Sequence, residues 1–319
     1  MALNRLINNK IFEMDNFTKD ISKRRIELLK KSLPLNDSCL TKFYNAWNKL
    51  DDYVHQEQAL TTLIDKYRDN TDVSVVLLKC SILNQFYSTR INSKDLITLA
   101  KHIVCLNIDA KLEEGDWSVV GDIAKCPGLS NHISFASKYC NWHNQQSYPI
   151  YDRYVVDLLC ILKDNDELNS FKTKSQIKNE KDINKRYQAF GAALNELAYK
   201  KGNVLNFALD KNKNIIYKAL DRALWLLAKY YLGDEISVID IAEAIGAPIM
   251  KYIYEKFIIH QSENGAIAVS NEKETDWLDT KNTLQKICTK EGIKYNKETS
   301  NPELGQKIIE LKNTKQTNK

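Results

Sequence analysis

The residues best suited to chemistry lie in the segment 126–160. It begins with Pro127-Gly128 between two helical patterns. A turn of this kind presents backbone N–H groups at the start of the next helix, where they can bind a phosphate without a charged side chain. Further along, Pro149 keeps Tyr148 out of the helical conformation. Asp152 is therefore predicted to be the N-cap of the following helix, which keeps its carboxylate ionised. The chemistry indicated is phosphate binding beside one carboxylate.

Both signals also have a plain structural explanation. A Pro-Gly turn between helices is usually only a turn, and most N-cap aspartates only cap. The helix between the two signals, residues 133–143, carries Phe135, Tyr139, Trp142 and His143 on one face, and such a stripe normally belongs to a hydrophobic core. These residues become functional candidates because the next turn leads to Asp152.

The elements that must position these residues are predicted to be helices. Only ten glycines and five prolines are spread over 319 residues, which favours long helices over many short strands. Helical patterns cover residues 18–32, 38–68, 72–89, 93–105, 116–125, 133–143, 152–162, 186–200 and 214–232. The polar segment 163–185 is predicted to be a surface loop with short helical pieces. The fold class predicted is all-α, with room for one small hairpin.

The pattern changes after Gly233, which is predicted to end a helix. Residues 236–258 have the size of a helix–turn–helix, although two ordinary packing helices are the favoured interpretation. Residues 265–277 suit a linker or a short hairpin. Residues 280–313 form a small basic two-helix unit that either touches DNA or caps the fold. The predicted organisation is a helical domain over 1–235, with its catalytic region at 75–162, and a C-terminal extension over 236–319.

Composition narrows the class of protein. Hydrophobic residues make up 43% and charged residues 27% of the chain, as in ordinary globular proteins. No apolar run reaches the roughly 20 residues that span a bilayer, and the N-terminus lacks a signal-peptide pattern. The seven cysteines form no CxxC pair. We therefore expect reduced thiols in a cytoplasmic protein, with no disulfide framework, no metal site and no cofactor.

The charge is unevenly distributed. The net charge is +5, but residues 161–230 hold 14 Lys and Arg against 8 Asp and Glu, and residues 281–319 hold 9 against 4. A basic half is compatible with a polyanionic partner, although solvated helix faces explain it equally.

A resemblance to a known family joins these observations. The Pro127-Gly128 turn, the helix after it, and the Pro149-x-x-Asp152 entry into another helix resemble the helix–hairpin–helix DNA glycosylase superfamily. Within it, residues 131–138 (NHISFASK) are most similar to the archaeal 8-oxoguanine glycosylases. The resemblance covers Val75 to Leu162. It implies a helix–hairpin–helix glycosylase-like fold, in which the turn grips the DNA backbone and Asp152 acts at the sugar of a flipped-out nucleotide.

A second match lies upstream, in residues 81–91 (SILNQFYSTRI). It resembles the superfamily's helix end, from which an Asn or Gln enters the space left by the extruded base. The resemblance makes Gln85, with Asn84 beside it, the wedge and lets Arg90 reach the orphaned partner base. An amide that caps the helix is the alternative for Asn84. The predicted DNA-binding residues are Asn84, Gln85, Arg90, Gly128, Ser130 and Lys138.

One departure from the family concerns the nucleophile. Bifunctional members use a lysine to form a Schiff base, and Asn131 stands at the position matched to it. Lys138 lies two turns along and is interpreted as a phosphate or structural residue. The expectation is therefore a monofunctional enzyme that uses water. Its carboxylate, Asp152, would stabilise the positive charge that develops on the sugar.

The extruded base needs a pocket. Its aromatic walls are predicted to come from Tyr87, Phe135, Tyr139 and Trp142, with Tyr154 steadying the sugar or phosphate and His143 reading polar groups of the base. For each of these side chains, a place in the core or in a solvated loop is the alternative.

The leading hypothesis is a monofunctional DNA glycosylase acting on double-stranded DNA, with neither a membrane nor an obligate protein partner. The base is a damaged or modified one: an 8-oxoguanine in repair or, as we favour, an unusual base such as a modified cytosine in phage DNA, as an antiviral defence. The alternatives are a non-catalytic helix–hairpin–helix DNA-binding protein and an all-helical hydrolase of another nucleoside.

Overall fold

The computed structural model describes residues 26–27, 29–233, 240–241, 244–246, 258–261, 267–270, 284–289, 292–296, 298–300, 303–305, 307–308 and 310. Its contacts divide the chain into two units, residues 30–229 and residues 1–29 with 230–319. The division at 229–230 lies a few residues before the boundary predicted at 235–236.

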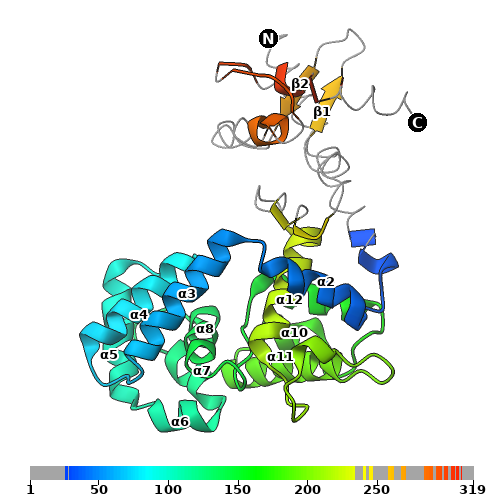
Figure 1. The fold of residues 1–319 in the computed structure, drawn as a ribbon. Helices are drawn as coiled ribbons and strands as arrows, with labels where there is room; N and C mark the ends of the chain where they lie inside the picture. The colour runs from blue at the N-terminus through cyan, green and yellow to red at the C-terminus, as the bar shows by residue number, and fades with distance from the viewer. Residues whose placement is uncertain are drawn as a thin grey trace, which may run out of the picture. The chain divides into compact units, whose positions relative to one another are not determined.

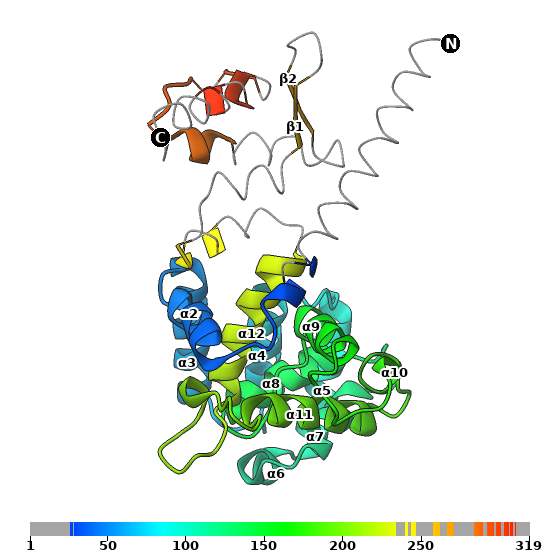
Figure 2. The same cartoon turned by 90° about the vertical axis from the view of Figure 1, so that its right-hand side faces the viewer.

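The unit 30–229 is built from helices (Figures 1 and 2), so the all-α prediction is confirmed. In Figure 1, helices α3 to α8 lie to the left and α2 and α10 to α12 to the right. The helices are α2 (Asp37–Trp47), α3 (Asp51–Lys66), α4 (Val73–Phe86), α5 (Ser93–Leu106), α6 (Asp109–Glu114), α7 (Ser118–Ala124), α8 (Ile133–His143), α9 (Arg153–Asp164), α10 (Lys174–Lys178), α11 (Ile183–Ala198) and α12 (Tyr217–Leu232), with a 3-10 helix η1 (Asn206–Ala208).

Polar N-caps set most of the helix starts. The side chains of Asn36, Asp72, Asn92, Asp152 and Asp182 each accept a hydrogen bond from a backbone N–H in the first turn of the helix that follows. Such bonds satisfy donors that have no partner inside the helix. These local rules explain why most predicted helices are found close to their expected positions.

Two helix predictions need correction. Residues 38–68 were expected to be one helix, but the chain breaks between α2 and α3, and α3 starts afresh with Asp51 and Asp52 in its first turn. Acidic residues favour a helix N-terminus and disfavour continuation of a helix behind them. Helix α6 was not predicted. In the predicted helix 18–32, residues 29–31 are helical and residues 18–25 lie outside the described part.

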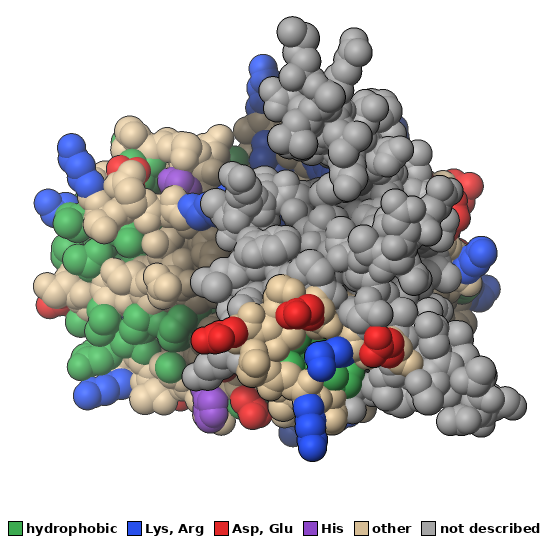
Figure 3. All heavy atoms as spheres, turned by 90° about the horizontal axis from the view of Figure 1, so that it is seen from above, with side chains coloured by type: hydrophobic (Ala, Val, Ile, Leu, Met, Phe, Trp, Pro, Cys, Tyr) green, Lys and Arg blue, Asp and Glu red, His purple; other side chains and the backbone are tan. Residues whose placement is uncertain are grey.

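Helix α4 is apolar on most of its faces but is buried on one side only. Val76, Lys79, Cys80 and Leu83 face the interior, whereas Leu78 is 45% exposed. Ile97, on the neighbouring helix α5, is 43% exposed. Figure 3 shows hydrophobic side chains gathered on this side of the unit, on the left of the view. The exposed Leu78 and Ile97 thus form part of an apolar surface on α4 and α5.

A fully buried lysine in the middle of α4 joins this helix to the loop before it. The Lys79 ammonium donates to the backbone oxygens of Arg68 (3.3 Å) and Asp69 (2.9 Å) and to the side-chain oxygen of Asn70 (2.9 Å). Asn70 is held in turn by Asp109 of α6. These bonds satisfy every donor of the ammonium, which makes its burial possible.

The second unit contains an antiparallel hairpin of β1 (Ile258–Gln261) and β2 (Ile267–Ser270), with Ile258 opposite Ser270 and Gln261 opposite Ile267. Strand β2 falls within the segment 265–277, where a hairpin or linker was predicted. Strand β1 begins at the last residue of the predicted helical segment 236–258, most of which lies outside the described residues.

In the predicted two-helix unit 280–313, residues 284–289 and 303–305 are helical. Gly292 turns the chain with φ of +68°, and Leu284, Ile287 and Leu304 are buried.

The sequence led us to expect no membrane-spanning segment, no metal site and no disulfide framework. Within the described residues, no helix is long and apolar enough to cross a membrane, and no cluster of His, Cys, Asp and Glu has metal-binding geometry. All seven cysteines are free thiols, and five of them are buried.

Replacing Lys79 by methionine should lower the free energy of unfolding by about 2–4 kcal/mol, because the three oxygens that tie the loop to α4 lose the ammonium as a donor. Urea titration followed by circular dichroism measures this change. Lys94→Met, at an exposed lysine on α5, is the control and should change stability by about 0.5 kcal/mol or less. Equal effects of the two substitutions would contradict the structural role of Lys79.

Candidate active site

A cavity of about 580 Å³ opens where the ends of four helices meet, and this volume is typical of small-molecule and cofactor sites. The C-terminal end of α4 contributes residues 87–89, and the start of α8 contributes residues 131–135 and Lys138. Helix α9 contributes residues 151–153, Val156 and Asp157, and α10 contributes Lys178 and Asn179. Two helix N-termini, those of α8 and α9, thus border one cavity.

Asp152 takes the N-cap position that the sequence predicts. Its Oδ1 accepts a hydrogen bond from the backbone N–H of Tyr154 (2.9 Å), and its side chain is 18% exposed. The extended segment before it is held by two buried bonds: the Tyr151 N–H donates to Ser137 Oγ (2.9 Å), and the Tyr187 hydroxyl donates to the Pro149 oxygen (2.6 Å). The second carboxylate oxygen, Oδ2, is left facing α8.

Lys138 faces this carboxylate from α8. Its Nζ lies 3.5 Å from Asp152 Oδ2 and donates to Ser134 Oγ at 2.7 Å. The side chain is only 3% exposed. From the sequence, Lys138 was interpreted as a phosphate or structural residue that lies two helical turns after Asn131. The structure instead directs its amine into the cavity, because Lys138 lies on the buried face of α8, one helical turn after Ser134.

Tyr87 links the cavity to the interior of the unit. Lys138 Nζ lies 5.3 Å from the centre of its ring, and its hydroxyl oxygen accepts from Trp142 Nε1 (3.0 Å) and Lys218 Nζ (3.1 Å). Burial raises the pKa of Tyr87, so its phenol stays protonated. Tyr87 is thus a cavity wall whose position is fixed from behind.

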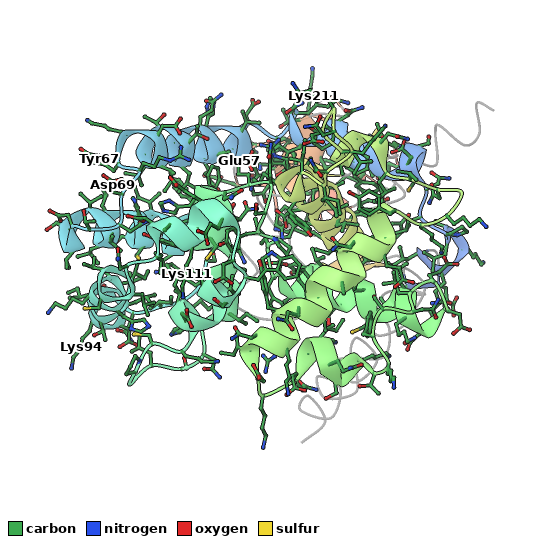
Figure 4. All side chains as sticks on the ribbon, turned by 90° about the horizontal axis from the view of Figure 1, so that it is seen from below. Glu57, Tyr67, Asp69, Lys94, Lys111 and Lys211 are labelled. Carbon is green, nitrogen blue, oxygen red and sulfur yellow. The ribbon has the colours of Figure 1, made fainter. Side chains whose placement is uncertain are left out.

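The support behind Tyr87 is a buried ionic cluster. Lys218, 2% exposed, pairs with Glu57 at 2.8 Å, and Arg222 pairs with the other oxygen of Glu57 at 2.5 Å. Glu57 points from α3 toward α12 (Figure 4). Although burial opposes the charge of Lys218, the neighbouring Tyr87 and Glu57 raise its pKa. The ammonium therefore remains charged, as a paired buried lysine can.

The structure separates the residues predicted to form the base pocket. Phe135 and Tyr87 line the cavity, but Tyr139, Trp142, His143 and Tyr154 do not. Tyr139 is fully buried and bonds to Asn70, and Trp142 is 4% exposed behind Tyr87. Helix α8 packs against α7, α4 and α3, and Tyr139 and Trp142 take the place in the core that was named as the alternative for them.

His143 and Tyr154 have other surroundings. The His143 ring lies 5.0 Å from that of Tyr139, and burial, together with the charge of Lys79, lowers the pKa of His143 to about 3. This imidazole is neutral at physiological pH. The Tyr154 ring lies 5.3 Å from the guanidinium of Arg153.

The predicted phosphate-binding turn is a closed hairpin between α7 and α8. The N–H of His132 donates to the oxygen of Ala124 (3.3 Å), and that of Leu129 donates to the oxygen of Cys126 (3.1 Å). Gly128 has φ of +79° and open space where a side chain would be, and Ser130 is exposed. The tip of the hairpin is accessible to a ligand, and Asn131 behind it lines the cavity.

Asn84 and Gln85, the residues predicted to enter the DNA, have different surroundings beside the loop that follows α4. Asn84 Oδ1 accepts from Thr89 Oγ1 (2.7 Å) and the Ile91 N–H (2.9 Å), and its Nδ2 donates to the Ile91 oxygen (3.0 Å). Asn84 therefore holds the loop internally and leaves Gln85 as the exposed amide.

The same loop contains two unusual backbone conformations. Ser88 and Arg90 have positive φ, 48° and 59°, which non-glycine residues adopt rarely and often near functional sites. Ser88 lines the cavity, and the Arg90 side chain is exposed.

Sequence reasoning missed several groups at or near the cavity. Asp157 and Lys178 form an ion pair of 2.5 Å in its wall, and Asn179 lies beside them. The spacing of Asp152 and Asp157 along one helix was a usable signal for Asp157. The polar segment 163–185 carried no periodicity that could place Lys178 or Asn179, so their position depends on how α10 packs on α9.

Asp221 of α12 is another group that was missed. It is half-buried near Lys218, Lys138 and two carboxylates, those of Asp152 and Glu57. Burial, opposed by Lys218 and aided by the charge of Asp152, raises the pKa of Asp221 to about 7. A carboxyl that changes charge near neutral pH therefore lies close to the Lys138–Asp152 pair.

The raised pKa of Asp221 predicts a pH-dependent stability. Between the pKa of an unfolded aspartate, about 4, and about 7, the folded state binds more protons, so the free energy of unfolding falls as pH rises. Asp221→Asn should therefore gain about 1 kcal/mol relative to the wild type between pH 5 and pH 8, the value being reduced for partial exposure. Urea titrations at the two pH values measure this, and the same difference at both would contradict the assignment.

Comparisons with known proteins give a family and no solved relative. A family model called HI_0787_N, described as an N-terminal domain, matches residues 39–148, the stretch from α2 to the residue before Pro149. No solved structure matches the chain significantly. The chain is also similar to a protein of Haemophilus influenzae described as "Uncharacterized protein", with 30% identity over 202 residues, covering 60% of this chain and 88% of that protein. Neither description names an activity. The chain belongs to the HI_0787_N family.

Proposed function

We propose that this protein is a DNA glycosylase that excises a damaged or modified base, with Lys138 as the nucleophile and Asp152 as its partner. The observation that carries the proposal is the pair itself: an amine and a carboxylate 3.5 Å apart, in one cavity of about 580 Å³. Lysine amines placed in partly dry sites are the usual nucleophiles for Schiff-base chemistry.

The reaction begins with the bond between C1′ of the sugar and the base. The Lys138 ammonium first gives a proton to Asp152, which leaves a free amine. As the bond breaks, its electron pair leaves with the base, and the base takes the proton from Asp152. Asp152, a carboxylate again, stabilises the positive charge that develops on the sugar, and the free amine bonds to C1′. Opening of the sugar ring transfers a second nitrogen proton to the ring oxygen and leaves a protonated imine on Lys138.

This differs from the water-based mechanism that the sequence suggested. That expectation depended on Asn131 at the start of α8, where the family pattern has its lysine. An amine from further along the same helix supplies the missing group, because the buried face of α8 carries Lys138 to the carboxylate. Water remains the alternative nucleophile, with Lys138 then acting through its charge alone.

The surroundings of the cavity support DNA as the substrate. The exposed hairpin tip at Gly128 and Ser130 and the loop bearing Gln85 and Arg90 offer contacts for a backbone and for the space left by a flipped base. Base extrusion also demands a concave site of nucleotide size, which the cavity provides.

Trapping with borohydride on a duplex that contains an abasic site tests the amine. Wild-type protein should give a covalent protein–DNA adduct, because borohydride reduces the imine to a stable amine bond, and Lys138→Gln should give none. Denaturing gel electrophoresis measures the adduct. Lys163→Gln is the matched control, since that ammonium also lies over an aromatic ring (Phe171, 5.8 Å) and bonds to a backbone oxygen, but outside the cavity. It should trap normally.

Removing the carboxylate tests base release. Asp152→Asn should lower the release of free base from modified DNA about 100- to 1000-fold, with duplex affinity largely kept. Mass spectrometry of bases released from several modified phage DNAs and from DNA containing 8-oxoguanine measures this. Release by wild type without trapping would make water the nucleophile. Release that survives Asp152→Asn, or release from free nucleotides alone, would overturn the proposal.

A further inference from the structure

The end of the cavity away from the amine carries a second polar group. Asp157 Oδ1 and Lys178 Nζ are 2.5 Å apart, and their side chains remain 35% and 39% exposed. Asn179 lies next to them at the end of α10, and its side-chain amide has no protein partner within the described residues. The proposed reaction does not use any of these three residues.

The position of this group is fixed relative to Asp152. Tyr151, the residue before Asp152, donates its hydroxyl to the backbone oxygen of Ile177, the residue before Lys178. Asp152 and Asp157 belong to the same helix start and helix, so with a rise of 1.5 Å per residue they lie about 7.5 Å apart along the axis of α9. The two polar ends of the cavity therefore keep a constant separation.

The cavity lining also contains apolar side chains. Ile133 and Phe135 come from α8, Val156 comes from α9, and the Tyr87 ring follows α4. Two separated polar groups together with apolar side chains match a nucleotide whose base is extruded: the sugar binds at Lys138 and Asp152, the flat faces of the base contact apolar side chains, and its hydrogen-bonding edge reaches the second polar group.

We infer that Asp157, Lys178 and Asn179 are specificity-determining residues that read the hydrogen-bonding edge of the excised base. The inference rests on the proposed glycosylase function and deepens it. Asp157 can only accept hydrogen bonds and Lys178 can only donate them, while Asn179 can do both. This set fits a base whose edge presents an N–H or amino donor beside an acceptor, either a carbonyl oxygen or a ring nitrogen. The substrate class is thus a base with both a donor and an acceptor on its edge, and not one that has lost its donors, such as 1,N6-ethenoadenine.

The same two helices provide a matched control. Lys174 of α10 pairs with Asp164 of α9 at 2.5 Å, with side chains 47% and 46% exposed, and neither residue lines the cavity. Breaking this pair removes a similar tether between α9 and α10 without touching the site. Any effect that comes from loosening α10 should therefore appear in both sets of variants.

The experiment compares two reactions of each variant: release of a base from a modified duplex, and reaction with an abasic site, which has no base. Each variant is given duplexes that contain one 8-oxoguanine, hypoxanthine, uracil, 5-hydroxymethylcytosine or 1,N6-ethenoadenine, and a duplex with an abasic site. Base release is measured by mass spectrometry and abasic-site reaction by borohydride trapping. The quantity compared is the ratio of the two rates, because the abasic duplex offers no edge for these residues to contact.

Asp157→Asn and Lys178→Met should each lower this ratio about tenfold to a hundredfold on the preferred base, as expected for a lost base-edge contact. Asp164→Asn and Lys174→Met should leave it within twofold. Wild type should not release 1,N6-ethenoadenine, which has no hydrogen-bond donor for Asp157.

An unchanged ratio in both site variants would overturn the inference, as would an equal fall in the control variants. Wild-type protein that traps abasic DNA but releases only ethenoadenine, or none of these bases, would overturn it too, while leaving Lys138 as the nucleophile. Absence of both trapping and release in the wild type would instead remove the proposed function, so the two failures are distinguishable.

Discussion

The site depends on the burial of a charged amine. Lys138 is almost inaccessible to solvent, and a buried ammonium is tolerated only when a carboxylate and hydrogen-bond acceptors surround it. Asp152 can meet this need only if the chain reaches the start of α9 in an extended conformation, which Pro149 and the bonds from Tyr187 and to Ser137 impose. The carboxylate is then both the N-cap of α9 and the counter-ion of Lys138 on the preceding helix, α8. Loss of either partner would leave the other as an uncompensated charge in the cavity wall.

A second buried lysine extends this constraint into the core. Lys218 and Lys138 lie on either side of the Tyr87 ring, at 5.7 Å and 5.3 Å from its centre. Lys218 is neutralised by Glu57, which comes from a helix more than 150 residues earlier in the chain. The ring that walls the cavity is thus fixed by an ion pair between α3 and α12. This arrangement transmits the packing of distant helices to the position of the amine, and it explains why two otherwise costly buried ammonium groups occur together.

Local signals in the sequence predicted what local physics decides. The N-cap role of Asp152, the Pro-Gly hairpin and most helix starts follow from residues within one turn of each feature. What the sequence could not predict depends on which face of a helix the rest of the fold covers. Lys138 was interpreted as a phosphate or structural residue, and its pairing with Asp152 was not predicted. Asn84 was predicted to contact DNA, with a capping amide as the alternative, and its amide closes a loop. The pairing of Asp157 with Lys178 joins two elements across a segment without periodicity, so spacing alone contained no information about it.

Lys138 and the two carboxylates of α9 lie in different stretches of the chain. The family model ends at residue 148, so the domain it represents holds the hairpin and Lys138 but neither Asp152 nor Asp157. Lys138 therefore belongs to one stretch of chain, and its partner Asp152 and the Asp157–Lys178 pair belong to the next. Because Asp152 and Asp157 lie at the start of the same helix, and Tyr151 bonds to Ile177 of α10, the two polar groups of the cavity cannot move independently.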